Sequence, residues 1–272
     1  MELTARSRID PGLFGPDSVA WRVDREVVVL AGGTAALMLQ LAHPAVAAGV
    51  AQHSDFQADA FGRLRRTLTS SYAVVFGTTP RAERAIARMN AIHGAVSGTV
   101  PETGRPYAAR DPRLLLWVHE TLIDTAVRIY ERFVAPLTSA EADSYHAEGC
   151  EIAIRLGVPA DRLPPTLADL RADMRHRVAS GEVAVSPTAR RLRDAVLYPA
   201  RFPPRWVWDA AHLVSFSLLP PAIRSGYEIP WNHRRQRAVE RLAAASRRVL
   251  PLVPPALRYM PQARSAESRL HL

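Results

Sequence analysis

Apolar residues recur along this chain at the three- and four-residue spacing of amphipathic helices, and no run alternates apolar and polar residues as a half-buried strand does. The pattern predicts helices over about 17–41, 44–53, 59–76, 79–98, 111–134, 138–157, 167–180, 186–197, 204–218 and 231–250. We therefore expect an all-α fold, a multi-helix globular domain.

Cap residues mark several of these helix starts. Thr79-Pro80 and Asp111-Pro112 place a capping side chain before a proline, and Thr138 with Glu141 has the spacing of a capping box. Gly32-Gly33 predicts a weak point within the first helix. The stretch 99–109 reads as a loop, and the tail from about 251 as loosely structured, packing at most as an arm. No boundary separates two domains, so we expect one domain over 1–272.

The segment 27–51 is apolar except at Thr34, Gln40 and His43, and Pro44 interrupts it. A membrane-spanning helix needs about 20 apolar residues with few interruptions. We therefore expect two buried core helices here rather than a span.

Composition and charge restrict the partners. The formal net charge is +9, yet no lysine occurs, and the arginines are scattered along polar helix faces, often beside acids. No aromatic residues alternate with them as in an RNA-binding sheet, so we expect no nucleic-acid partner. The single cysteine, Cys150, forms no intrachain disulfide, and the first 20 residues lack the apolar core of a signal peptide. The expected location is cytoplasmic.

Three histidines, His43, His93 and His119, lie within apolar helical patterns. His93 shares a face with Ile86, Met89 and Val96, and His119 lies in a stripe with Leu115, Leu122 and Ala126. A neutral imidazole on an apolar wall suits a haem iron, which needs one nitrogen donor in an apolar slot. The alternative is a structural histidine in the core. Without an HExxH motif or a Glu-x-x-His pair, zinc and di-iron sites have little support, and Cys150 reads as a structural thiol.

A second group of polar residues follows one side of the helix over 59–76, where Arg63, Thr67 and Ser70 are spaced by four and three. Arg63 could pair with a haem propionate, and Thr67 could hydrogen-bond a ligand on the iron. The alternative is a solvated helix face. Nucleophile-elbow, phosphate-loop and dinucleotide motifs are absent from the sequence.

Three segments carry a resemblance to a known family: Gly33 to Gly77, including HPAVAAGVAQHSDF and RLRRT; Arg88 to Gly98, RMNAIHGAVSG; and Tyr107 to Leu122, YAARDPRLLLWVHETL. Their order resembles the catalytic domain of bacterial rubber oxygenases (latex clearing proteins) and the fungal MpaB oxygenase. The resemblance covers about 20–160 well and the later helices more loosely. It implies an all-helical protein with haem b that uses O2 to cleave C=C bonds of isoprenoid chains.

The resemblance also assigns residues. His93 matches the proximal iron ligand; His119 would be a second polar residue near the haem, or the ligand if the match is shifted by one helix. Arg63 and Thr67 match residues close to the haem. Arg66 stands where rubber oxygenases have a lysine that can bind the iron, and guanidinium is a very poor ligand because it stays protonated. The resting iron would then be open, water-bound, or capped by His43 or His53.

The leading hypothesis is a haem b-dependent oxygenase acting with O2 on a lipophilic small molecule, with Arg63, Arg66 and Thr67 around the reacting ligand. A second hypothesis keeps the haem but changes the reaction to that of a peroxidase, a dehydratase or another tailoring step in a biosynthetic pathway. A third is a non-enzymatic protein whose apolar groove binds haem or lipid, or whose basic surface docks on an anionic membrane.

Overall fold

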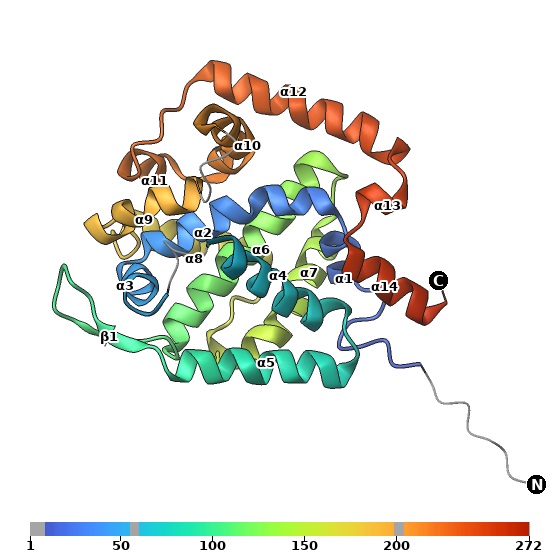
Figure 1. Ribbon diagram of the computed structural model, residues 1–272, viewed down its shortest axis with the longest axis horizontal. Coiled ribbons are helices and arrows are strands. Elements are labelled where there is room, and N and C mark those ends of the chain that lie inside the picture. Colours follow the sequence, from blue (N-terminus) through green and yellow to red (C-terminus); the bar gives the residue numbers. More distant parts are fainter. Residues whose placement is uncertain (1–8, 55–59, 199–203, 272) are drawn as a thin grey trace, which may run out of the picture.

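The computed structural model describes residues 9–54, 60–198 and 204–271, without the side chains at 60, 61, 63 and 64. These residues form fourteen α-helices, three 3-10 helices and one hairpin (Figure 1). The helices are α1 (Val19–Asp24), α2 (Gly33–Ala42), α3 (Pro44–His53), α4 (Ala60–Phe76), α5 (Thr79–Gly94), α6 (Pro112–Phe133), α7 (Ser139–Arg155), α8 (Leu167–Ala179), α9 (Pro187–Leu197), α10 (Arg205–Leu218), α11 (Pro221–Gly226), α12 (His233–Val249), α13 (Pro255–Arg258) and α14 (Pro261–Leu270). The 3-10 helices are η1 (Val27–Gly32), η2 (Ala160–Arg162) and η3 (Leu250–Leu252). The all-α prediction is confirmed.

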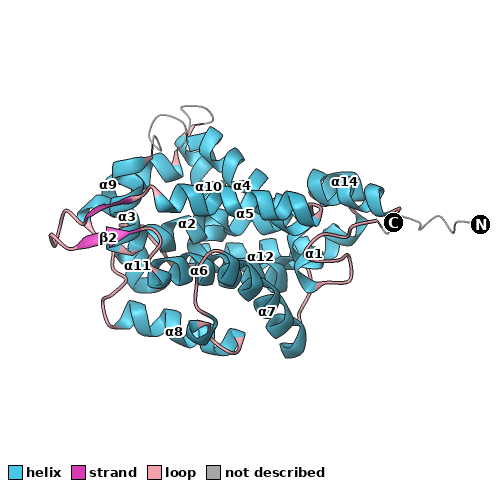
Figure 2. Cartoon of the chain, turned by 90° about the horizontal axis from the view of Figure 1, so that it is seen from below, coloured by secondary structure: helices cyan, strands magenta, loops and turns pink. Residues whose placement is uncertain are grey.

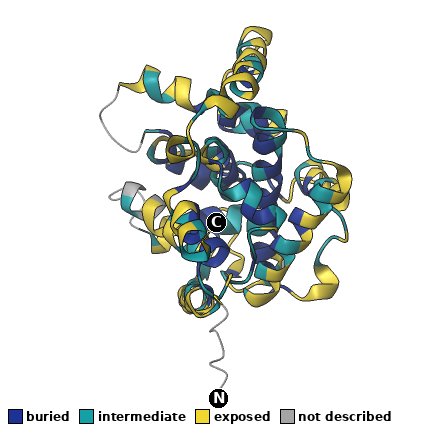
Figure 3. Ribbon diagram, turned by 90° about the vertical axis from the view of Figure 1, so that its right-hand side faces the viewer, coloured by how far each residue is buried: buried dark blue, intermediate teal, exposed yellow. Residues whose placement is uncertain are grey.

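Helix α6 forms the centre of the molecule and packs against α1, α2, α7, α8, α12 and η1. Its 22 residues begin after Asp111, whose side chain accepts a hydrogen bond from Arg113 N, and Pro112 occupies the first turn. Trp117 is fully buried, and its Nε1 donates a 3.0 Å hydrogen bond to the Leu39 carbonyl of α2. Buried residues gather in the interior of the molecule, and exposed ones lie on its outer segments (Figure 3).

Both helices of the apolar segment 27–51 contribute to the core, as expected: α2 buries Met38, Leu39 and Leu41, and α3 buries Ala47 and Ala48. Between residues 17 and 41 the chain is less regular than predicted, because α1 ends at Asp24 and the 3-10 helix η1 precedes α2. The chain changes direction at Glu26, whose buried carboxylate pairs with Arg258 near the C-terminal end. That contact cannot be read from local sequence.

None of the described helices is by itself long and apolar enough to cross a membrane. The pair Val27–Ala42 and Pro44–His53 passes the same test when taken together, but it is bent by 102°.

The segment predicted as a loop over 99–109 contains a small hairpin instead. Strand β1 (Ser97–Thr99) pairs antiparallel with β2 (Pro106–Ala108), and the hairpin projects at one edge of the molecule (Figure 2). Gln52 of α3 holds it: its Nε2 donates to the Thr99 carbonyl at 2.8 Å, and its Oε1 accepts from the Tyr107 hydroxyl at 2.7 Å. Helix α5 consequently ends at Gly94 rather than near Gly98.

The C-terminal segment is helical rather than loosely structured, which corrects the prediction. Helix α14 packs against α4, and Met260, Ala263 and Ala266 form an apolar cluster with Trp21 and Phe76. A hydrogen bond of 2.7 Å from Met260 N to the Arg25 carbonyl joins the two ends of the described chain. The ten residues of α14 form a helix here because one face, with Ala263 and Ala266, is buried against α1 and α4.

Candidate functional site

Helices α4 and α5 pack side by side, joined only by Gly77 and Thr78. Since consecutive helices with so short a connection run antiparallel, the end of α5 lies opposite the beginning of α4. His93 is the last residue but one of α5, whereas Arg63, Arg66 and Thr67 lie in the first half of α4. The topology therefore brings the predicted ligand and the predicted polar residues to the same end of one helix pair.

His93 is half-buried, and its Nδ1 is buried without a hydrogen-bond partner among the described residues. Burial lowers the pKa of the imidazole, and the nearby Arg110 guanidinium lowers it further, so the ring is neutral at pH 7. The predicted apolar face is present: Ile86 is buried, and Met89 packs against the core. A neutral ring with an unpaired nitrogen on such a face fits the demands of an iron ligand.

Gly94 and Arg110 shape the surroundings of His93. A Cβ atom on Gly94 would lie 2.9 Å from the Arg110 guanidinium, so glycine lets this cation lie against the end of α5. Arg110 Nη2 also donates a 3.0 Å hydrogen bond to the Asn90 carbonyl. Arg110 was not predicted as a site residue, although it lies within the YAARDP segment.

The residues predicted on α4 are placed only in part. The side chain of Arg63 lies outside the described residues. Arg66 and Thr67 are exposed on α4, which agrees with the solvated-face alternative in this structure. No described contact joins either of them to His93.

His43 and His53 already form hydrogen bonds with backbone groups. His43 caps α3, and its Nδ1 accepts a hydrogen bond from Ala45 N at 3.2 Å. His53 Nε2 lies 2.8 Å from the Ser97 carbonyl of the hairpin, to which it donates. Burial lowers the pKa of His43, so its ring is neutral and, with Nδ1 as acceptor, carries its proton on Nε2. Its one lone pair is thus engaged in the cap, which makes it a poor iron ligand.

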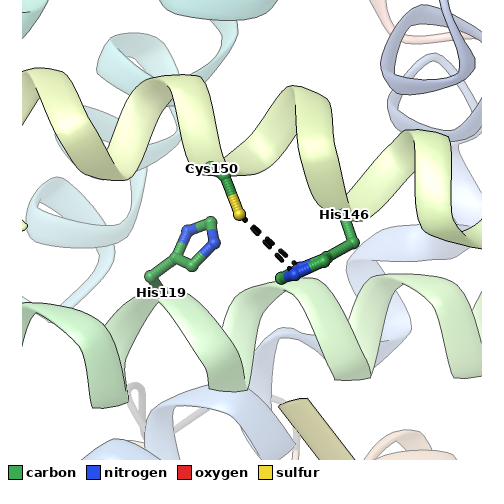
Figure 4. Close-up of side chains that lie close together, drawn as sticks. All are labelled: His119, His146 and Cys150. Atoms are coloured by element: carbon green, nitrogen blue, oxygen red, sulfur yellow. Dashed lines mark hydrogen bonds between the residues drawn. The ribbon is translucent and has the colours of Figure 1, made fainter. Parts of the chain in front are cut away.

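His119 lies in a different group. It projects from α6 towards His146 and Cys150 of α7, and one donor atom of each of the three residues lies within 4.8 Å of the others (Figure 4). His119 is half-buried with a buried, unpartnered Nε2, but Leu122 of its predicted apolar stripe is 49% exposed. Burial, followed by the proximity of His146, lowers the pKa of His119 to about 4. His119 is therefore a neutral base at the α6–α7 interface.

The partners of His119 are held by helix geometry. His146 and Cys150 are four residues apart on α7 and so share a face. Cys150 Sγ lies 3.6 Å from His146 Nε2 and 3.8 Å from its Nδ1, and burial raises the pKa of the thiol to about 11. This pair was missed because Cys150 was interpreted as a structural thiol; the His-x-x-x-Cys spacing of His146 and Cys150 was the available signal.

Glu120, next to His119, is the most deeply buried acid of this region, at 0% exposure. Burial raises its pKa to about 8, Arg177 lowers the value, and the carboxyl of Asp173 raises it again. The distance from Arg177 Nη2 to Glu120 Oε2 is 3.9 Å. The interior beside the three-residue group therefore contains an acid that is only weakly compensated.

A cavity of about 400 Å³ lies between α6, α8 and the end of α10, away from all the predicted site residues. Asp124 forms ion pairs along it with Arg171 at 2.8 Å and Arg128 at 3.3 Å, while Leu39, Trp117 and Met174 supply apolar walls. Four of its charged groups, those of Asp124, Arg128, Glu131 and Arg171, are paired with one another.

The model of one protein family matches residues 21–248, and its description is the catalytic domain of the ER-bound oxygenases mpaB/B' and rubber oxygenase. The chain belongs to this family. As a member of the MpaB/rubber oxygenase family it falls within a family of oxygenases, and the expected resemblance is confirmed over most of the chain.

Two mycobacterial proteins are similar to this MpaB/rubber oxygenase family member. The uncharacterised proteins Rv2237 of Mycobacterium tuberculosis and Mb2261 of Mycobacterium bovis are each 28% identical to it over 226 residues, which cover 80% of this chain and 87% of theirs. No solved structure matches the chain significantly. The family match thus supports an oxygenase role.

Proposed function

We propose that this protein is a haem b-dependent oxygenase that acts with O2 on a lipophilic small molecule, and that His93 is the iron ligand. The observation that carries the proposal is the buried, unpartnered Nδ1 of a neutral His93 at the end of α5, in a chain whose family consists of oxygenases. Of the histidines weighed for the iron, His43 and His53 engage in local hydrogen bonds, and His119 faces α7.

Haem supplies the activation of O2, which amino-acid side chains cannot perform by themselves. His93 would bind the iron, and Arg110, which lies against Gly94, would pair with a propionate carboxylate. Arg63 and Arg66, at the opposing end of α4, would add positive charge at the cofactor edge, and Thr67 would donate a hydrogen bond towards the reacting ligand. Ile92, 55% exposed beside His93, and Met89 would give the substrate an apolar approach.

Cleavage of a C=C bond in an isoprenoid-like chain is the reaction that we propose within this class. Arg66, at the position of the rubber oxygenase lysine, would not bind the iron, because a guanidinium does not deprotonate. The proposed partner besides O2 is a small unsaturated lipid, which contains the C=C bond to be cleaved. Peripheral contact with an anionic membrane, from which such a substrate would be drawn, is part of the proposal.

The first experiment is an absorption spectrum of the purified protein in the oxidised, reduced and CO-bound states. We expect a Soret band that shifts with CO, and its loss in His93→Gly. Added imidazole should restore the band in that variant by replacing the missing side chain. His176→Gly, which removes an exposed histidine of α8, is the matched control and should keep the wild-type spectrum.

The other outcomes are equally informative. A protein that takes up no haem on reconstitution would refute the proposal, and loss of the band in His119→Gly but not in His93→Gly would move the ligand to α6. Given haem, consumption of O2 with an isoprenoid supports the oxygenase, whereas consumption of peroxide, or turnover with neither oxidant, supports the peroxidase or dehydratase. An iron that responds to neither CO nor cyanide indicates a binding protein.

A further inference from the structure

The α6–α7 interface carries a second group of ligand-type side chains, separate from His93. His119 comes from α6, whereas His146 and Cys150 come from consecutive turns of α7 (Figure 4). The three donor atoms, two imidazole nitrogens and one sulfur, lie within 4.8 Å of one another. We propose that this group binds one transition-metal ion of the zinc class, and that the ion joins α6 to α7.

The side chain of His146 is already oriented as in metal-binding histidines. It is 1% exposed, and its Nε2 lies 2.7 Å from the Pro164 carbonyl. Because a carbonyl can only accept, Nε2 carries the proton and Nδ1 keeps its lone pair. A histidine that binds a metal generally donates its other N–H to a carbonyl or carboxylate in this way, which fixes both the tautomer and the ring orientation.

His119 supplies the second nitrogen. Its Nε2 is buried, and no described residue donates to it or accepts from it. A buried polar atom without a partner is unfavourable, and a metal ion at this place would satisfy it.

Gly149 permits this arrangement. A Cβ at position 149 would lie 3.1 Å from His119 Cε1 and 2.5 Å from Ile123 Cδ1, so a larger residue would displace the Ile123 side chain and shift the His119 ring. Glycine thus lets the His119 ring lie against the helix that carries the other two ligands.

The donor set selects the class of metal. Two imidazoles and one thiolate suit Zn²⁺, Co²⁺ or copper, whereas Mg²⁺ and Ca²⁺ require oxygen ligands. Zinc bonds measure about 2.3 Å to sulfur and about 2.0–2.1 Å to nitrogen, so rotations of the three side chains would have to draw the donor atoms inward. Three protein ligands leave the fourth tetrahedral position for water.

The test is a titration of the full chain, stripped with a chelator and reduced, with Co²⁺ as a spectroscopic probe. We expect saturation at one equivalent, with a near-ultraviolet thiolate-to-cobalt charge-transfer band that Zn²⁺ abolishes by competition. Cys150→Ser should lack the band, and His119→Gln should bind Co²⁺ at least about tenfold more weakly. His176→Gln, the matched exposed histidine, and His93→Ala should bind as the wild type does.

Several results would overturn the proposal. They are a wild-type protein without the charge-transfer band, a band that persists at full affinity in His119→Gln, and a band that disappears in His93→Ala. Because serine is nearly isosteric with cysteine, Cys150→Ser should keep the helical circular dichroism of the wild type. A purely structural thiol–imidazole contact would give no band in any variant, and haem binding at His93 is measured independently by the Soret band.

Discussion

The carboxyl group of Asp24 lies between α1 and α7, where the Tyr145 hydroxyl donates a 2.9 Å hydrogen bond to its Oδ1. Burial raises the pKa of Asp24 to about 7; the Tyr145 hydrogen bond opposes the shift, and the nearby Glu148 carboxylate adds to it. Glu148 cannot move away easily, because it accepts hydrogen bonds from Val19 N and Ala20 N at the start of α1. The folded chain therefore binds a proton at Asp24 more tightly than the unfolded chain, whose aspartates have a pKa of about 3.9.

From this difference we expect part of the stability to be lost as the pH rises from about 4 to about 7, with no further loss from this group above that range. Asp24→Asn keeps an oxygen for the Tyr145 hydroxyl and removes the charge. It should raise the free energy of unfolding at pH 8 by about 2–4 kcal/mol, and change it little at pH 4. Urea denaturation at the two pH values measures this, with the exposed Asp17→Asn as control. Equal effects of Asp24→Asn at both pH values would contradict the explanation.

Single residues show what could be predicted from sequence and what could not. His93 could be singled out because its apolar face is local to one helix. The four-residue spacing of His146 and Cys150 was a local signal, but their meeting with His119 depends on the rotation of α6 and α7 about their axes and could not be predicted. The raised pKa of Asp24 has the same origin, since Asp24 and Glu148 are 124 positions apart in the sequence.

At the level of elements, the end of α5 that joins α4 is capped from far along the chain. Asp10 Oδ2 accepts a 2.7 Å hydrogen bond from Thr79 N, and its Oδ1 accepts from the Thr79 hydroxyl at 2.9 Å. Thr78, at the N-cap position, makes no side-chain capping bond. Gly12 follows with φ of +89°, and a Cβ there would collide with the Gly77 carbonyl, so the loop fits only with glycine.

Asp10→Ala should lower the free energy of unfolding by about 1–2 kcal/mol, the usual cost of losing an N-cap. Asp10→Asn retains one acceptor oxygen, so its free energy of unfolding should lie between those of the wild type and Asp10→Ala. Thermal unfolding of the three proteins measures the difference, and Asp161→Ala, an exposed acid of η2, is the control. Hydrogen bonds lower the pKa of Asp10, and the one from Gly12 N contributes most. The stabilisation should therefore disappear as the pH falls through that lowered pKa. An Asp10→Ala protein as stable as the wild type would show that α5 needs no cap.

Helices whose caps are local were predicted to within a residue or two. The Thr138 and Glu141 side chains form the expected capping box, and Ser186 accepts from Ala189 N at the start of α9. Elements that depend on distant partners were missed: the break at Glu26 needs Arg258, the hairpin needs Gln52, and α14 needs the Trp21 cluster. Sequence periodicity detects burial along one helix but not the identity of what buries it.

On the scale of the whole molecule, α12 forms the outermost layer above α6 and α10 (Figure 1). Its outward side carries a stripe of exposed arginines beside a stripe of exposed apolar residues that continues into η3 and α13. The arginines are Arg234, Arg237, Arg241 and Arg248; the apolar residues are Leu242, Val249, Leu252 and Leu257. Leu252 and Leu257 are 81% and 75% exposed, unusual values for leucine, and together with the arginines they suit the headgroup region of an anionic bilayer.

We expect the protein to sediment with vesicles containing phosphatidylglycerol but not with vesicles of phosphatidylcholine alone, and to be released at about 1 M salt, where charge attraction is screened within about 3 Å. The double variant Arg241→Glu/Arg248→Glu should lose most of this binding. The control, Arg81→Glu/Arg84→Glu, alters exposed arginines of α5 at the opposite side of the molecule and should bind normally. Equal loss in both double variants would indicate an effect of net charge alone.

The ion pair between Glu26 and Arg258 also governs the order of events during translation. Glu26 is 1% exposed, and the Arg258 guanidinium, its ion-pair partner, lies 232 positions later in the chain. At a synthesis rate of about 5–20 residues per second, Arg258 is added to the chain roughly 10–50 seconds after Glu26. Burying the Glu26 carboxylate earlier would leave an uncompensated charge, which is strongly unfavourable. The turn at Glu26 and the surface that α14 covers are therefore expected to close only after the ribosome has released the last helices, and the nascent N-terminal helices must be protected from aggregation until then.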